Sequence, residues 1–114
     1  MTVTAANRRR YQRVPFFARV VTTPLDGSRP IETQTFDISL GGVGLASPRA
    51  IPSGQSVRLA FHLNDRKRGP VVEELVARIA HVRSDEHGCT LGVEFLSPLT
   101  EAAAPVLYGR MIDL

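Results

Sequence analysis

The chain has 114 residues, which is enough for one domain with a modest core and too few for two independent units. Hydrophobic residues make up 43% and charged residues 22%, as is ordinary for a soluble globular protein. No apolar run approaches the roughly 20 residues that a membrane helix needs, and no apolar segment follows the N-terminal arginines as in a signal peptide. The composition therefore predicts a cytoplasmic protein without membrane insertion.

The net charge of +3 is concentrated near the N-terminus. Arg8, Arg9, Arg10 and Arg13 lie within six residues, and removing these four from the 14 basic residues leaves 10, against 11 acidic ones. Proteins that coat long nucleic acids usually spread positive charge over a face, so one compact anion is the better match. The single cysteine, Cys89, excludes an intrachain disulfide and a four-cysteine zinc site.

Residues 1–13 are polar and basic without an amphipathic period, which predicts a flexible arginine-rich arm. Alternating apolar residues then predict a first strand over 16–23. Asp26-Gly27 predicts a turn after this strand, because glycine adopts positive φ without strain.

A second strand is predicted over 31–38. Simple alternation puts Phe36 and Ile38 on one face of this strand and Asp37 and Ser39 on the other. The polar pair would therefore lie together at its end.

The following segments continue the alternation of apolar residues up to Phe95. Five or six strands joined by short turns within about 80 residues are typical of a small antiparallel barrel. We therefore predict an all-β fold, a six-stranded antiparallel β-barrel. Its later strands are expected over 43–46, 57–63, 71–83 and 89–95.

The tail beyond residue 96 changes to helical spacing, with apolar residues at Leu99, Ala103, Val106, Leu107 and Met111. Ser97-Pro98 has the composition of a helix start, with serine as the cap and proline at the first position. Because an interior proline breaks the hydrogen-bond ladder, we expect either a kink at Pro105 or a helix that begins only there. The helix is expected to pack on the barrel, so that residues 14–114 form one unit behind the arm.

Two short motifs carry recognisable chemistry. Arg9-x-x-x-Arg13 lies directly before the first strand, and Asp37-x-Ser39-x-x-Gly42 follows the second. Alone, a basic run is usually a solvated tail, and the second pattern is usually a turn with local side-chain hydrogen bonds. Their order around the same two strands favours one joint site.

The hydrogen-bond donors and acceptors of these residues match those that a cyclic guanine dinucleotide needs. Guanidinium groups bind phosphate oxygens in bidentate geometry, match the acceptor edge of guanine and stack on its ring. The carboxylate of Asp37 would accept hydrogen bonds from guanine N–H groups. Gly41 and Gly42 would let the backbone approach a ligand closely.

The motifs, their order and the strand pattern resemble the PilZ domain family over nearly the whole chain. Further matches are Val14-Pro15 after the arm, Gly42-Val43-Gly44-Leu45 after the loop and Gly92-Val93-Glu94-Phe95 in the last strand. The resemblance implies a bacterial, single-domain receptor that binds the second messenger cyclic di-GMP on the outside of the barrel.

The resemblance also implies residue roles. Arg9 and Arg13 would grip phosphate and guanine, Asp37 and Ser39 would hydrogen-bond the other base, and Gly42 would shape the loop. The implied ligand-binding set is Arg8, Arg9, Arg10, Arg13, Asp37, Ser39, Gly41, Gly42 and His81.

Three members of this set have subsidiary roles. Arg8 resembles the position whose arginine accompanies binding of two mutually stacked ligands, and Arg10 is expected to assist. Many family members carry an aromatic residue, often tryptophan, late in the long strand, and His81 is the equivalent here. His81 would either stack on a guanine or be an exposed strand histidine without a ligand role.

The implied mechanism is folding on binding, in which the arm orders around the ligand and changes the surface offered to a downstream protein. The alternative is a PilZ-like protein–protein adaptor that binds no ligand, although such members typically lack the arginines.

Other classes of function have weaker support. His62, His81 and His87 lack metal-ligand spacing, and Glu73-Glu74 are adjacent, so they face opposite sides of a strand. We therefore expect no enzyme, no metal site and no cofactor. A barrel that binds single-stranded nucleic acid would need exposed aromatic residues on a basic groove, so no nucleic acid polymer is expected as a partner.

Overall fold

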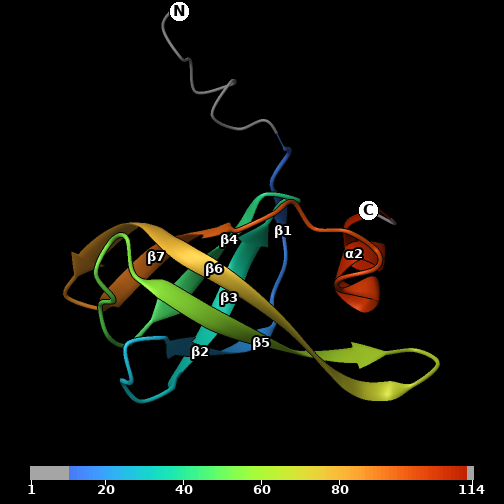
Figure 1. The fold of residues 1–114 in the computed structure, drawn as a ribbon, viewed down its shortest axis with the longest axis horizontal. Helices are drawn as coiled ribbons and strands as arrows, with labels where there is room; N and C mark the ends of the chain where they lie inside the picture. The colour runs from blue at the N-terminus through green and yellow to red at the C-terminus, as the bar shows by residue number, and fades with distance from the viewer. Residues whose placement is uncertain (1–10, 113–114) are drawn as a thin grey trace, which may run out of the picture.

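The computed structural model describes residues 11–112, so the predicted arm lies outside the described part except for its last three residues. Within that part, the chain forms strands and a C-terminal helix (Figure 1). No helix among these residues has the length and hydropathy that a membrane crossing requires. The elements are β1 (Val14–Pro15), β2 (Arg19–Pro24), β3 (Ile31–Ile38), β4 (Gly42–Ser47), β5 (Ser56–Asp65), β6 (Gly69–Asp85), β7 (Gly88–Phe95) and α2 (Pro105–Ile112).

Six of these strands form a closed antiparallel barrel, as predicted. Their hydrogen-bonded order is β3-β2-β5-β6-β7-β4, and β4 pairs back onto β3 to close the ring. The short strand β1 is additional. It pairs with the end of β3 through Val14–Ile38 and Pro15–Asp37, beyond the residues that pair with β2.

Residues 16–18 separate β1 from β2, so the prediction of one strand starting at Phe16 was wrong. The side chain of Thr35 explains the break. Its Oγ1 accepts a hydrogen bond from the N–H of Ala18 at 2.8 Å and donates one to the carbonyl of Phe16 at 2.6 Å. A side-chain hydroxyl thus replaces part of the backbone ladder.

A β-bulge near the end of β3 changes the predicted faces. The register with β4 shifts between Thr35 and Asp37. Ile38 is therefore fully buried while Phe36 is 38% exposed, although the alternation predicted them on one face. A bulge inserts one extra residue and so moves the following side chains to the opposite face.

In β5 and β7 the core follows the predicted alternation. Phe61 of β5 and Phe95 of β7 meet edge to face, with ring centroids 6.5 Å apart. This geometry is favourable for aromatic pairs and adds to the burial of their surface. The inward-facing residues of these two strands that are buried are Val57, Leu59, Phe61, Leu63, Leu91, Val93 and Phe95.

Helix α2 begins at Pro105, so the second of the two predicted starts is confirmed and the one at Ser97-Pro98 is wrong. Glu73 of β6 determines this start. Its carboxylate oxygens accept hydrogen bonds from the backbone N–H groups of Val106 at 2.9 Å and Leu107 at 2.8 Å. These donors have no partner within a helix, and a negative charge at this end is favourable. The helix packs on the barrel with Val106 and Leu107 buried.

Candidate functional site

The loop between β3 and β4 is held in place by hydrogen bonds at each of its residues. The backbone N–H of Ser39 donates to the carbonyl of Gly42 at 2.8 Å, and the N–H of Gly41 donates to Ser39 Oγ at 3.2 Å. The carbonyl of Gly41 accepts from Phe95 at 2.9 Å, and that of Leu40 accepts from Leu99 at 2.7 Å. The loop is therefore anchored both internally and to the end of β7.

Arg13 and Asp37 join the two predicted motifs. Arg13 Nη1 donates to Asp37 Oδ1 at 2.9 Å, and the side chains are 32% and 28% exposed. The pair is thus partly shielded from water, which strengthens it relative to a fully exposed ion pair. Both groups remain accessible at the barrel surface.

A cavity of about 300 Å³ opens beside this loop. Five predicted site residues line it, and Asp37 borders it through Arg13. Arg8, Arg9 and Arg10 lie outside the described residues. The structure therefore brings together the described part of the predicted site, whose lining members are Arg13, Ser39, Gly41, Gly42 and His81.

The outer face of β4 and β7 forms a glycine floor, made of Gly42, Gly44 and Gly92. Gly44 pairs directly with Gly92 in the ladder. A Cβ built on Gly92 would lie 2.0 Å from Cε1 of His81, and one on Gly44 would lie 2.6 Å from Oδ1 of Asp37. Since no side chain could fit at either position, the imidazole and the carboxylate each lie against a glycine of the same rung.

His81 reaches this floor because of a second β-bulge. The register of β6 with β7 shifts between Ile79 and His81, and His81 pairs with Gly92. Its ring is exposed and forms part of the cavity wall. Whether it contacts a ligand stays a prediction.

Sequence reasoning did not assign seven of the lining residues to the site: Tyr11, Ala80, Gly92, Val93, Glu94, Phe95 and Pro98. Tyr11 occupies one of the unspecified positions of Arg9-x-x-x-Arg13. A Cβ on Gly41 would lie 2.8 Å from Cδ2 of Tyr11, so this ring packs on the loop. Glycine inside a strand pattern was the available signal for Gly92, because it often marks a close approach of another group.

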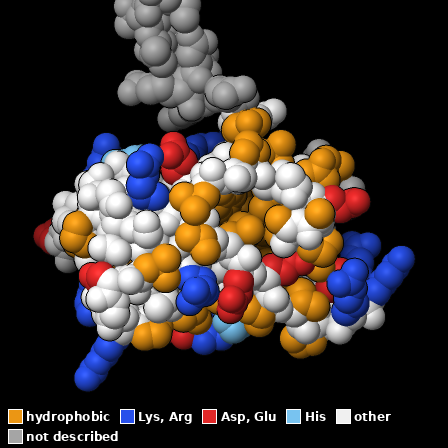
Figure 2. Space-filling model, in the orientation of Figure 1, with side chains coloured by type: hydrophobic (Ala, Val, Ile, Leu, Met, Phe, Trp, Pro, Cys, Tyr) orange, Lys and Arg blue, Asp and Glu red, His pale blue; other side chains and the backbone are white. Residues whose placement is uncertain are grey.

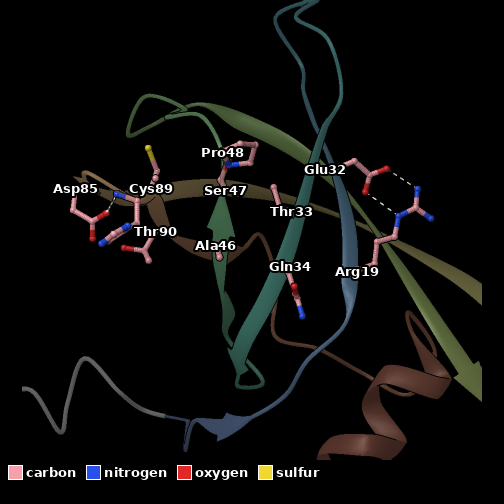
Figure 3. A pocket seen from close by; sticks show the side chains of 12 residues that line it. Arg19, Glu32, Thr33, Gln34, Ala46, Ser47, Pro48, Asp85, Cys89 and Thr90 are labelled. Atoms are coloured by element: carbon pink, nitrogen blue, oxygen red, sulfur yellow. Dashed lines mark hydrogen bonds and ion pairs between the residues drawn. The ribbon is translucent and has the colours of Figure 1, made fainter.

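A larger cavity of about 740 Å³ lies between β3, the end of β4 and the start of β7 (Figure 3). Its lining includes none of the predicted site residues. Arg19 and Glu32 on its rim pair in bidentate fashion, at 2.8 Å and 2.6 Å. The hydrogen bond from Arg19 is the main cause that lowers the pKa of Glu32 below its ordinary value of 4.5. Each of the two side chains thus satisfies hydrogen-bonding groups of the other, and nothing in this pair indicates a ligand.

Replacing Glu32 by glutamine is expected to lower the melting temperature slightly at pH 7 and not at about pH 2. Because the pKa of Glu32 is lowered in the folded state, its contribution to stability exists above its unfolded pKa and is lost as pH falls through the folded value. The effect is small because both side chains are more than half exposed. Scanning calorimetry at both pH values checks this, and an equal difference at both would contradict it.

Comparison with known proteins adds to this geometry. A family model described as PilZ domain matches residues 7–108. A search of curated protein sequences found no match.

Among solved structures, the PilZ domain of YcgR from Escherichia coli with c-di-GMP has a TM-score of 0.67 at 21% identity, covering 94% of this chain and 91% of that one. The Bacillus subtilis inhibitor of motility, MotI/DgrA, gives 0.67 at 22% identity and 93% coverage, and this chain spans only 52% of its length. The PilZ domain of CeSA from a cellulose-synthesizing bacterium gives 0.61 at 21% identity, covering 87% and 97%. Likeness at these identities concerns the fold.

Proposed function

The chain belongs to the PilZ domain family, and on that premise we propose that it is a cyclic di-GMP receptor that signals in trans to a partner protein. The observation that carries this proposal is the Arg13–Asp37 contact beside the 300 Å³ cavity. Arg13 comes from the arginine motif and Asp37 from the loop motif, and each motif has the chemistry that one end of the ligand needs. The YcgR domain, which has the same fold, was solved with this ligand.

In the proposed complex, Arg13 and the arginines before it bind the phosphates and the guanine acceptor edges. Ser39, Gly41 and Gly42 form the wall that receives the ligand. Because hydrogen bonds already fix this loop, the entropic cost of binding falls on the arm rather than on the barrel.

The arm is also the proposed output element. Residues 8–10 directly precede Tyr11, which packs on Gly41 at the cavity. Arginines held over a bound dianion would lie against the barrel, and the surface formed there would exist only with ligand. A partner that recognises this surface would respond to the messenger.

A polymer of nucleic acid is a poorer fit. On the face drawn in Figure 2, basic side chains are interspersed with acidic and hydrophobic ones and form no continuous stripe. Binding along a phosphate backbone depends on such a stripe. A small dianion requires only the local cluster that the arm and Arg13 supply.

The test is isothermal titration of the protein with cyclic di-GMP, cyclic di-AMP and the linear guanine dinucleotide. Saturable binding of cyclic di-GMP, with much weaker binding of the other two, is expected. Ligand at about 100 times Kd should also stabilise the fold by about 2.7 kcal/mol, which a melting curve detects. No heat and no shift in Tm would contradict the receptor and favour the adaptor.

The same sample tests the ordering of the arm. Backbone amide signals of residues 2–10 are expected to shift and broaden or disperse on saturation. Narrow, unshifted arm signals at saturating ligand would contradict folding on binding without contradicting the receptor.

A further inference from the structure

A second ion pair of an arginine and a carboxylate reaches the same cavity through its carboxylate. Arg78 of β6 and Glu94 of β7 are direct cross-strand partners, and Arg78 Nη2 lies 3.0 Å from Glu94 Oε1. Glu94 lines the cavity and pairs across the ladder with Gly42. Glu94 lies in the Gly92-Val93-Glu94-Phe95 stretch that matches the family, but neither residue belongs to the arginine motif or to the loop motif.

The two pairs flank the glycine floor. Asp37, held by Arg13, lies against Gly44. Glu94, held by Arg78, stands beside Gly42 in the ladder, two residues from Gly44 along β4. One carboxylate therefore borders the floor on the β3 side and the other on the β7 side.

Guanine has a chemical reason to prefer such a carboxylate. Its Watson–Crick edge presents N1–H and the N2 amino group side by side, and these donors match the two oxygens of one carboxylate. Adenine presents an acceptor at N1 and has no amino group at C2, so the same carboxylate would repel it. A ligand with two guanines can use two carboxylates.

Arg78 lets the Glu94 carboxylate lie close to a negatively charged ligand. Its guanidinium contacts one oxygen of Glu94 and offsets the repulsion between the carboxylate and a dianionic ligand. The side chains of Arg78 and Glu94 are 55% and 59% exposed, so the carboxylate is open to an incoming base.

We propose that Glu94, positioned by Arg78, reads the second guanine and makes the site selective for a dinucleotide with two guanines. This inference rests on the proposed receptor function. It adds a specificity-determining residue that lies in neither motif.

The test compares cyclic di-GMP with the mixed cyclic GMP–AMP, which has the same two phosphates and only one guanine. The wild-type protein is expected to prefer cyclic di-GMP by about tenfold or more, the discrimination that one bidentate contact to a base supplies. Glu94→Gln should abolish or invert this preference, since glutamine pairs bidentately with adenine. The matched control is Glu74→Gln, an exposed glutamate of β6 opposite Ala60, which should keep the wild-type ratio.

Each outcome is decisive. Wild-type selectivity in Glu94→Gln would overturn the role of Glu94 and leave the receptor intact. A wild-type protein that binds neither ligand would overturn the receptor, and the inference with it. A melting curve checks that Glu94→Gln is folded, which is expected because the ion pair is more than half exposed.

Discussion

Replacing Arg13 by alanine is expected to weaken cyclic di-GMP binding by at least about tenfold, since loss of even one charge-assisted hydrogen bond costs roughly 1.5–3 kcal/mol. The substitution also leaves the Asp37 carboxylate without its partner at the cavity edge, where it would repel the dianion. Both effects weaken binding. Isothermal titration measures the loss.

The control for this experiment is Arg19→Ala. Arg19 also pairs with a carboxylate on the barrel surface, yet it lies on the rim of the larger cavity. Arg19→Ala removes the same charge and should change the affinity less than about twofold, because Arg19 does not line the smaller cavity and salt screens an exposed charge. Equal losses in both variants would mean that net charge alone attracts the ligand, and would contradict a specific role of Arg13.

Replacing Gly42 by alanine is expected to lower the free energy of unfolding by about 1–3 kcal/mol, the usual cost of inserting an atom into a packed site. A Cβ at this position would lie 2.3 Å from the carbonyl oxygen of Val93. That oxygen belongs to the backbone of β7, with which Gly42 pairs, so relief requires the two strands to move apart. Because Gly42 also lines the cavity, weaker ligand binding should accompany the loss of stability.

Urea unfolding monitored by circular dichroism measures this change. Gly109→Ala is the matched control, because a Cβ on this helical glycine meets no atom within 4 Å. Alanine there should instead raise the free energy of unfolding by up to about 1 kcal/mol, through its higher helix propensity. A Gly42→Ala variant as stable as the wild type would show that the strands at this rung adjust freely.

The strands were predictable because alternation in the sequence reports which face is buried. β5 is the clearest example, since its buried residues occupy every second position. The faces around Phe36 were not predictable, because the bulge depends on how β3 pairs with β4. For α2 the sequence left two starts open, and the one at Pro105 is supported by a distant residue, Glu73, whose carboxylate caps the helix from another strand.

The site also contains residues that the sequence indicates and a residue that only the fold brings into place. Arg13 and Asp37 belong to local patterns, so their types and order already indicated a joint anion site. Glu94 belongs to the Gly92-Val93-Glu94-Phe95 stretch that matches the family, but that stretch did not indicate a role in the site. Only the register of β7 against β4 and β6 brings it beside Gly42 and Arg78, and register is not visible in a single sequence.

Barrel closure also affects how the protein behaves in concentrated solution. Unpaired strand edges are templates on which another chain can add a strand and begin aggregation. Because β4 pairs back onto β3, the six strands of the ring leave no free edge strand within residues 11–112. One longer stretch stays open, since residues 69–76 of β6 pair with β5 and not with β7. Pro70 lies in this stretch and lacks the N–H that an added strand would need. Closure therefore confines edge-to-edge association to the extension of the β5–β6 hairpin, where Val72 and Val76 are exposed.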